Sequence, residues 1–530
     1  MHRRNFLKGV AAGSAAALFS PRLSLAAESR VLKFVPSADV TVVDPVWTTA
    51  YVTRNHGYMV FDTLYGYDDN FQIRPQMVAG HEIGKDGLEW RLTLRDGLKF
   101  HDGEPVLARD VVASIRRWAD RDVFGKDLMA ATDELSAASD KVVVFRLKRP
   151  FALLPAALGK MTSRMPCIMP ERLAMTPPSE QVTEVIGSGP FRFVADERVQ
   201  GALTVYEKFQ DYVPREGSAV GRTGGPKIAN VDRVEWHVMP DAATASGALQ
   251  AGEVDWVESP LPDLLPLLRS QDGIEVKLLD TSGTIGSMRL NHLHPPFDNP
   301  AIRRAVLSVI DQKNFMQAVA GEDPSMWRAG VGVFTPESPM ASDAGMDILN
   351  GPRDFEAGKA AIAEAGYNGE PVVLLAASDY AALRAEAEVG ADTLNRLGLN
   401  VDYQSLDWGT IQQRRRSREP LDKGGWSCLY TGINGLEAWD PSSHQNSRGL
   451  GDAGQYGWPV SDELEAARKA WLEAPDLAGQ KAACERIQLG VFDVVPYIPL
   501  GLHYAPAAFR STVSNIPYGF AQFYGVTKSA

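Results

Sequence analysis

The sequence predicts an α/β protein with mixed sheets, divided into about three or four structural units. Strand-like and helix-like patterns alternate along the chain, no internal repeat occurs, and no Gly/Ser-rich linker separates the units. The chain has 530 residues, of which 45% are hydrophobic and 23% charged, which is ordinary for a globular protein. Such a chain can bury a large core without disulfides or metals, and its composition excludes intrinsic disorder.

Each predicted element follows from the spacing of its apolar residues. Apolar residues at every second position predict strands over 88–94 and 143–147. A spacing of three to four residues predicts helices over 110–118, 384–397 and 461–475, the last lying between a capping serine and a proline. The same mixture of strands and helices continues to the end of the chain.

Charge and cysteine content exclude several functional classes. The chain carries 54 Lys and Arg against 66 Asp and Glu, a net charge of −12. An acidic chain is a poor general nucleic-acid binder, because phosphate binding depends on an excess of basic residues. The three cysteines, Cys167, Cys428 and Cys484, form neither a disulfide framework nor a zinc-binding spacing.

Residues 1–26 have the features of an export signal. Arg3 and Arg4 precede Phe6, a weakly apolar stretch rich in Ala and Gly follows, and Ser24 and Ala26 form a small-x-small cleavage pattern. The paired arginines resemble a bacterial twin-arginine signal. No cysteine lies near the cleavage site to carry a lipid anchor, and no apolar run is long enough to span a membrane. We therefore expect a soluble periplasmic protein that is not lipid-anchored.

A search for catalytic and metal-binding motifs finds no complete site. The sequence has no dinucleotide-binding glycine pattern, no P-loop, no HExxH and no GxSxG. The segment 101–104 is interpreted as a turn and the pair His292 and His294 as an incomplete metal site. The run 414–416 could contact an anionic ligand, but a solvated face is the favoured interpretation. Ser188 and Ser287 lack a recognisable base. We expect no catalytic residue, metal or cofactor, and a binding protein rather than an enzyme.

Several segments, in order along the chain, resemble one known family. The most distinctive covers residues 94–105 and continues through 108–111 with Ala-Arg-Asp-Val. The others are Val-Asp-Pro at 43–45, Gly-Ser-Gly-Pro-Phe at 187–191, the stretch 296–306, and the pair 364–367 and 396–401. Together they resemble the extracellular solute-binding proteins of the dipeptide, oligopeptide and nickel class (solute-binding family 5), the receptors of ABC importers.

The resemblance implies a two-lobe periplasmic-binding-protein clamp of the class II type, with an extra subdomain in the first lobe. The signal peptide would occupy 1–26, and the crossovers between lobes would lie near 281–291 and 499–503. Lobe I would comprise 27–50, the extra subdomain 51–185, then 186–280 and the C-terminal part 501–530, and lobe II would comprise 281–500. Ligand would bind between the lobes, where closure excludes water.

The resemblance also implies a set of ligand-binding positions. They lie in 47–51, in 285–289, at Trp408 and in 426–439. The aromatic side chains offer flat apolar faces and the others offer hydrogen bonds, although plain core packing remains an equal alternative for each aromatic residue. The expected contacts are Trp47, Thr49, Tyr51, Ser287, Trp408, Trp426, Tyr430, Thr431, Ile433, Asn434 and Trp439.

One departure from the family pattern bears on the ligand. Ile433 stands where peptide-binding members have the acid that pairs with the ligand's amine, and Leu436 replaces a second acid. An apolar residue cannot stabilise a desolvated ammonium. We therefore expect a ligand other than an ordinary free-amine peptide: an amine-blocked peptide, an opine-like conjugate, a glycan or another neutral-to-anionic metabolite. The alternative is that Glu437, Asp440 or Asp407 replaces the missing acid.

The expected function is capture of a small-molecule or peptide-like solute by a monomeric protein. The protein would deliver it to the permease subunits of an ABC importer in the inner membrane. A non-transport role on the same fold, such as presenting ligand to a sensor or holding unfolded chains, is the alternative.

Overall fold

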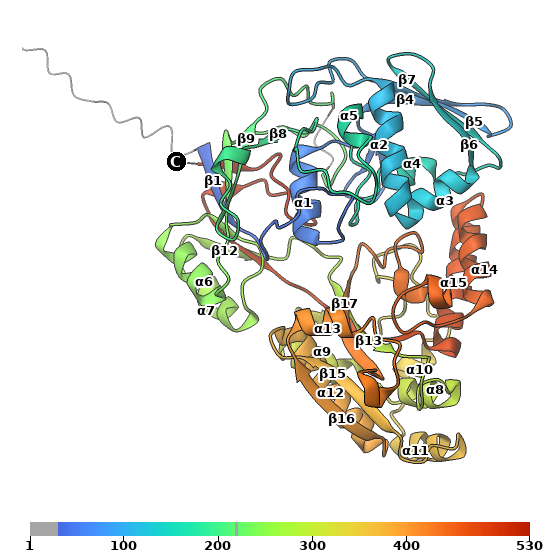
Figure 1. The fold of residues 1–530 in the computed structure, drawn as a ribbon. Helices are drawn as coiled ribbons and strands as arrows, with labels where there is room; N and C mark the ends of the chain where they lie inside the picture. The colour runs from blue at the N-terminus through green and yellow to red at the C-terminus, as the bar shows by residue number, and fades with distance from the viewer. Residues whose placement is uncertain (1–29, 218–220, 530) are drawn as a thin grey trace, which may run out of the picture.

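The computed structural model describes residues 30–217 and 221–529, and two large sheets organise them into two lobes (Figure 1). The predicted twin-arginine signal lies outside these residues. The prediction of mixed sheets is confirmed, because β1 pairs with β10 and β11 in parallel while β9, β12 and β19 pair antiparallel to their neighbours.

The first lobe is built on a seven-stranded sheet of order β12-β19-β11-β1-β10-β9-β8. Its strands, in chain order, are β1 (Val31–Val35), β8 (Phe191–Phe193), β9 (Leu203–Lys208), β10 (Arg233–His237), β11 (Trp256–Val257), β12 (Ile274–Lys277) and β19 (Ala507–Arg510). Helices α1 (Tyr51–Val60), α6 (Ala242–Ala251) and α7 (Leu265–Arg269) accompany this sheet, as do the short pairs β2 (Tyr65–Tyr67) with β3 (Ile73–Pro75) and β20 (Val513–Ser514) with β21 (Thr527–Lys528). Phe34 lies at the centre of this core, against Trp236, Trp256 and Phe523.

A separate antiparallel sheet of order β4-β5-β7-β6 lies at the upper right in Figure 1, away from the seven-stranded sheet at the left. It consists of β4 (Val78–Ile83), β5 (Glu89–Leu94), β6 (Thr132–Ala137) and β7 (Val142–Leu147), with helices α2 (Ala108–Arg121), α3 (Val123–Ala131), α4 (Leu154–Ala157) and α5 (Glu171–Ala174). The predicted strands over 88–94 and 143–147 and the helix over 110–118 are confirmed. Trp90, Leu92 and Leu94 alternate into the core as the pattern indicated.

The second lobe is built on a six-stranded sheet of order β14-β18-β13-β17-β15-β16. Its strands are β13 (Thr284–Leu290), β14 (Trp327–Arg328), β15 (Pro371–Ala377), β16 (Asn400–Leu406), β17 (Cys428–Asn434) and β18 (Tyr497–His503). Its helices are α8 (Pro300–Ser308), α9 (Gln312–Ala320), α10 (Asp347–Asn350), α11 (Phe355–Glu364), α12 (Ala381–Arg396), α13 (Trp408–Arg414), α14 (Asp462–Glu473) and α15 (Leu477–Val494). The helices expected over 384–397 and 461–475 correspond to α12 and α14, and Ser461 caps α14 by accepting a hydrogen bond from the Leu464 amide.

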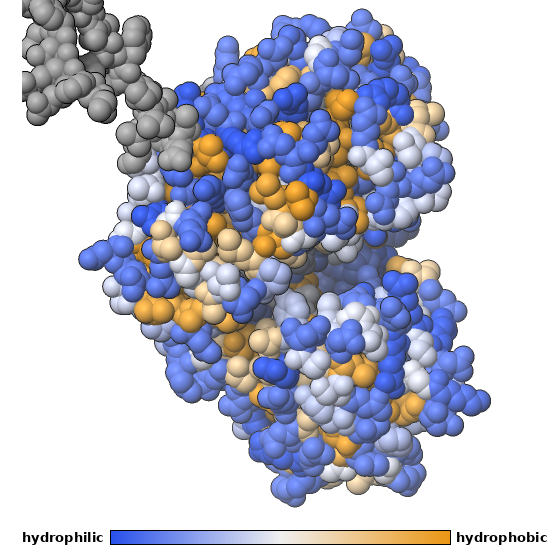
Figure 2. Space-filling model, turned by 60° about the vertical axis from the view of Figure 1, so that its left-hand side comes forward, coloured by the Kyte–Doolittle hydropathy of each residue, from blue (hydrophilic) through white to orange (hydrophobic). Residues whose placement is uncertain are grey.

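Two connections join the sheets of the two lobes. The chain passes from β12 to β13 through residues 278–283 and returns from β18 to β19 through 504–506. Most of the expected crossover ranges, 281–291 and 499–503, therefore lies inside strands β13 and β18. The domain boundaries given above remain a prediction. The surface is deeply indented between the upper and lower halves (Figure 2).

Candidate ligand-binding cleft

A cavity of about 510 Å³ lies between the two lobes. A cavity of this size suits a small organic ligand. The first lobe contributes Thr49, Asp122, Val123, Lys160, Ser163 and Arg164 to its lining. The second lobe contributes Arg289, Arg415, Arg416, Trp426, Leu429, Thr431, Gly432, Ile433, Glu437, Ser442, Ser443, Gln445, Asn446, Gln455 and Tyr456.

The paired strands β13 and β17 form the second-lobe wall. Their antiparallel register sets Ser287 opposite Thr431 and Arg289 opposite Leu429. Side chains alternate between the two faces of a sheet, so Leu429, Thr431 and Ile433 share the face that lines the cavity. The wall is therefore largely apolar, with the Thr431 hydroxyl at its middle and the Arg289 guanidinium at its end.

Cationic side chains outnumber acidic ones around the cavity. Five basic residues line it, Lys160, Arg164, Arg289, Arg415 and Arg416, against the two acids Asp122 and Glu437. This is the reverse of the whole chain, whose net charge is −12. The cleft therefore concentrates positive charge on an acidic protein and favours an anionic ligand.

The first-lobe side of the cavity is partly neutralised by internal pairs. The Lys160 ammonium is buried against the Asp122 carboxylate and also donates to the Ser163 carbonyl at 2.8 Å. Arg164 has a positive φ of 54°, a backbone conformation that non-glycine residues seldom adopt and that often marks a functional site. Burial lowers the pKa of the Arg164 guanidinium, while the nearby Asp122 and Glu437 carboxylates act to raise it.

Arg289 is the most deeply buried arginine of the cavity wall, with 5% of its surface exposed. One amino group donates to the Tyr456 carbonyl, and the other, Nη1, is buried without a partner among the described residues. No carboxylate of those residues forms an ion pair with it, although Arg415 lies close enough to act on it. Burial, reinforced by Arg415, lowers the pKa of Arg289 to about 10.

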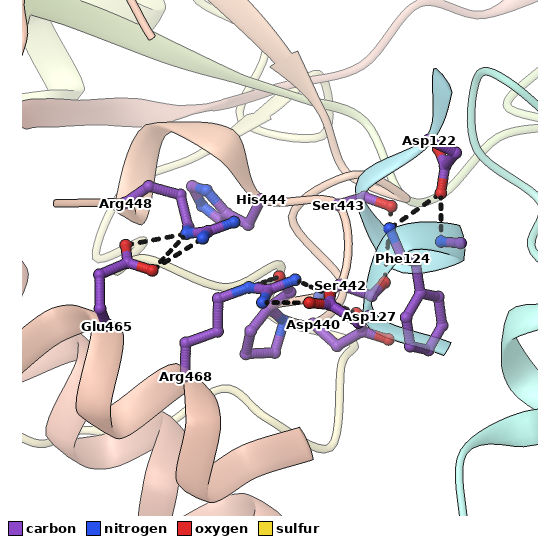
Figure 3. A network of polar contacts seen from close by, with 12 residues as sticks. Asp122, Phe124, Asp127, Asp440, Ser442, Ser443, His444, Arg448, Glu465 and Arg468 are labelled. Atoms are coloured by element: carbon purple, nitrogen blue, oxygen red, sulfur yellow. Dashed lines mark hydrogen bonds and ion pairs between the residues drawn. The ribbon is translucent and has the colours of Figure 1, made fainter. Parts of the chain in front are cut away.

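The two lobes touch through polar contacts beside the cavity. The Glu437 carboxylate accepts hydrogen bonds from Ser163 Oγ at 2.7 Å and from the Tyr51 hydroxyl at 3.0 Å, both in the first lobe. Further along, the Arg468 guanidinium on α14 pairs with Asp127 on α3 (Figure 3). These contacts hold the lobes together over the cavity.

Comparison with known proteins identifies this arrangement. The family model of bacterial extracellular solute-binding proteins, family 5, matches residues 72–445. The chain belongs to this family. It is 36% identical over 520 residues to a probable peptide ABC transporter periplasmic-binding protein of Sinorhizobium fredii, covering 97% of each chain.

Solved structures of other binding proteins share the fold. The AgaA protein of A. tumefaciens R10, in complex with agropinic acid, superposes with a TM-score of 0.78 at 19% identity, covering 94% of this chain and 99% of its own. The DppA protein of Helicobacter pylori, in complex with the peptide STSA, gives 0.77 at 21% identity, covering 96% and 100%. The two-lobe clamp is thereby confirmed, and this solute-binding protein takes up its ligand between the lobes.

Four of the expected contact residues line the cavity of this family 5 protein: Thr49, Trp426, Thr431 and Ile433. Ser287 lies on the same sheet face as Thr431 and Arg289 but is fully buried, and its hydroxyl accepts a hydrogen bond from Nδ2 of the cavity-lining Asn446 at 3.2 Å. Tyr51 stands at the rim, where it bonds Glu437.

The other five expected residues do not line the cavity. Trp47 packs under the Arg121 guanidinium, and Trp408 lies near Tyr380 and packs against the hydrophobic cluster that includes Trp426 and Leu429. Tyr430 is on the opposite face of β17, beneath α12, because it is one residue out of step with Thr431. Asn434 accepts from the Leu436 amide, and Trp439 stacks on Phe71 with ring centroids 3.7 Å apart. Whether any of these residues contacts ligand stays a prediction.

The sequence did not predict that basic residues gather around the cavity. The run 414–416 was interpreted as a solvated face, which is wrong for Arg415: its guanidinium lies over the Tyr456 ring at 4.8 Å and lines the cavity. Arg414 instead bonds the Gly425 carbonyl outside the cavity. Two sequence signals pointed this way: the arginine run itself, and the position of Arg289 in the expected contact range 285–289, two residues after Ser287 on the same strand face.

The two histidines of the predicted incomplete metal site make separate hydrogen bonds. His292 and His294 each bond a different backbone carbonyl, of Val495 and Arg418 respectively. No group of three His, Cys, Asp or Glu residues in the described ranges could hold a metal ion. No described helix is long and apolar enough to cross a membrane.

Proposed function

We propose that this protein captures a small polar solute of net negative charge between its lobes and delivers it to an ABC importer. Capture and delivery are the function of the family to which the chain belongs. The charge of the ligand is our inference, and the observation that carries it is the excess of five basic over two acidic side chains around the cavity.

The fold leaves the ligand class open. Proteins of the same architecture carry agropinic acid in one case and a peptide in another, and the S. fredii relative is named a probable peptide ABC transporter periplasmic-binding protein. Specificity must therefore come from the side chains of this particular cleft. An amine-blocked acidic peptide or an opine-like conjugate fits a basic cavity with an apolar wall.

The free-amine peptide remains the disfavoured ligand. Ile433 lines the cavity with 7% of its surface exposed and offers an ammonium no partner. Glu437 is the one candidate replacement that reaches the cavity, but both of its oxygens already accept hydrogen bonds from the first lobe. Asp407 caps α13 instead, and the half-buried Asp440 accepts a hydrogen bond from the Ser442 amide.

We also propose that the protein acts without catalysis, as a periplasmic monomer exported through the signal in residues 1–26. Neither serine considered as a nucleophile has a base: the Ser287 hydroxyl bonds Asn446, and the Ser188 hydroxyl is buried without a partner among the described residues. Conversion of ligand would need a nucleophile and base within hydrogen-bond reach of one another.

Two measurements test whether the ligand is negatively charged and whether its binding requires a free amine. Mass spectrometry of small molecules released from natively purified protein should identify an anion. Calorimetry with di- and tripeptides, each free and N-acetylated, should show acidic acetylated peptides binding about tenfold or more tighter than neutral ones, and more weakly at high salt. Tight binding of neutral free-amine peptides, lost on acetylation, would overturn the proposal.

A further inference from the structure

We infer that Arg289 and Arg415 form a carboxylate-binding subsite on the second-lobe wall. This subsite orients one acid group of the ligand against the six-stranded sheet. The inference rests on the proposed function, and it adds which residues select the acid group and in what geometry. In the part of the chain that the structure describes, no carboxylate forms an ion pair with either guanidinium.

Arg289 lacks the carboxylate partner that two other deeply buried cations of this protein have. Arg117 is paired with Asp44 and Lys227 with Asp62, in both cases with the two side chains fully buried. Arg289 is buried to a similar degree but meets a single carbonyl, and its Nη1 group has no partner among the described residues. A buried guanidinium retained without a counter-charge is destabilising unless something supplies that charge.

Tyr456 holds both guanidiniums at the cavity. Its backbone carbonyl accepts from Arg289 Nη2, and its ring supports the Arg415 guanidinium at 4.8 Å. The neighbouring Gly457 lets this loop dock on β13, because a side chain there would lie 2.4 Å from the Leu290 carbonyl oxygen, and its φ of 100° favours glycine. The loop thus fixes two like charges beside each other.

Arg415 is fixed from its other side as well. Its backbone carbonyl accepts a hydrogen bond from the Trp426 indole at 3.2 Å, and its Nε group is buried without a partner among the described residues. Burial lowers the pKa of Arg415, and Arg416 adds to that effect. Two adjacent guanidiniums repel one another, so an anion placed between them relieves both the repulsion and the unmet donors.

The geometry favours a carboxylate over other anions. Guanidinium groups present planar forks of N–H donors that match the two oxygens of a carboxylate. The adjoining wall is the apolar Ile433 and the Thr431 hydroxyl, which suits the carbon skeleton of an organic acid. The ligand class is therefore a compact organic acid whose carboxylate points toward β13.

The first test needs no ligand. Because Arg289 carries an unmatched buried charge, Arg289→Met should raise the melting temperature of the ligand-free protein, by roughly 1–3 °C. A residue with a merely structural role would lower it on removal. Arg384→Met, at an exposed arginine on α12 that does not line the cavity, serves as the matched control and should leave the melting temperature unchanged.

The second test uses N-acetylated di- and tripeptides, each as the free C-terminal acid and as the C-terminal amide. Wild-type protein should prefer the acids, and Arg289→Met or Arg415→Met should weaken acid binding at least about 30-fold while leaving amides unaffected. Arg289→Lys should recover little, because the ammonium lacks the planar fork. Arg384→Met, outside the cavity, should change acid binding by less than about threefold.

The outcomes separate the two proposals. If no acidic peptide outcompetes its neutral counterpart in wild-type protein, the proposed net-negative ligand fails, and the subsite with it. If acidic peptides bind but acid and amide forms bind equally, or Arg289→Met binds both as well as wild type, the subsite alone is overturned. A fall in the melting temperature of ligand-free Arg289→Met likewise overturns it. Circular dichroism confirms folding, and Arg415→Met provides a second variant should Arg289→Met not fold.

Discussion

Arg468 on α14 and Asp127 on α3 form an ion pair of 2.5 Å that joins the two lobes at the edge of the ligand cavity (Figure 3). The Arg468 side chain is 6% exposed and the Asp127 side chain 21%. The guanidinium also donates to the Pro441 carbonyl at 3.2 Å, so its position is fixed within the second lobe. The pair can form only when the lobes approach, and it therefore stabilises the closed form.

Removing the acid of this pair should weaken ligand binding without touching the ligand. Asp127→Asn should lower affinity about 5- to 30-fold, because a partly buried charged hydrogen bond contributes on the order of 1–2 kcal/mol to closure. Small-angle scattering should show a larger radius of gyration at subsaturating ligand. Glu473→Gln is the control: its pair with Arg149 also crosses the lobes, at 3.5 Å, but is more exposed and should contribute little. Equal effects of the two changes would contradict this assignment.

An acid placed on the cavity wall should convert the specificity of the cleft. Ile433→Asp introduces a carboxylate at a position that lines the cavity, so affinity for free-amine peptides should rise about tenfold or more. Binding of N-acetylated acidic peptides should fall, because like charges then face each other. Calorimetry with free and N-acetylated peptides measures both changes. Ile433→Asn introduces a side chain with the shape of Asp but no charge, and it should cause neither change in affinity. A similar gain in free-amine peptide binding in that variant would show that charge is not the cause.

The wall of the cleft was partly predictable from the sequence. Family resemblance pointed to the strand segments 285–289 and 426–439, and the period of two along a strand then selects Thr431 and Ile433 together. The aromatic residues could not be sorted in the same way. Strand alternation would place Trp426 and Tyr430 together on the face opposite Thr431, yet Trp426, which precedes β17, lines the cavity, while Tyr430 faces α12.

The basic character of the cleft was not predictable from the sequence. Lys160 and Arg164 come from a loop of the first lobe, Arg289 from a strand, and Arg415 from the end of a helix. No spacing relates these segments, because loop and lobe packing alone bring them together. A net charge of −12 spread over the whole chain further concealed the local excess of positive charge.

Export should depend on the paired arginines near the N-terminus. Replacing Arg3 and Arg4 together with Lys should leave the precursor in the cytoplasm, because the twin-arginine signal requires that pair. Cell fractionation followed by mass spectrometry of the mature N-terminus, expected near Ala27, measures this. A Lys8→Arg variant keeps the charge of the region and should export normally. Normal export of the double variant would contradict the proposed route.

The stability of the second lobe should depend on pH through Glu386. This side chain, on α12, is 1% exposed, and its Oε2 atom has no partner among the described residues. Burial raises the pKa of the Glu386 carboxyl to about 8, well above its value in an unfolded chain. The carboxyl is therefore neutral in the folded protein at pH 7 but ionised in the unfolded one.

The sign of the effect follows from proton binding. Below about pH 4.5 the carboxyl is protonated in both states, and Glu386 carries no penalty; as the pH rises toward 8, the unfolded state gains stability by releasing the proton. Glu386→Gln removes this proton release from the unfolded state. The substitution should therefore stabilise the protein at pH 8 by on the order of 3 kcal/mol relative to its effect at pH 4.5. Urea unfolding at the two pH values measures the difference. Glu388→Gln, an exposed acid on the same helix, should show no such pH dependence. If Glu386→Gln instead stabilises equally at both pH values, the carboxyl is not buried in its neutral form.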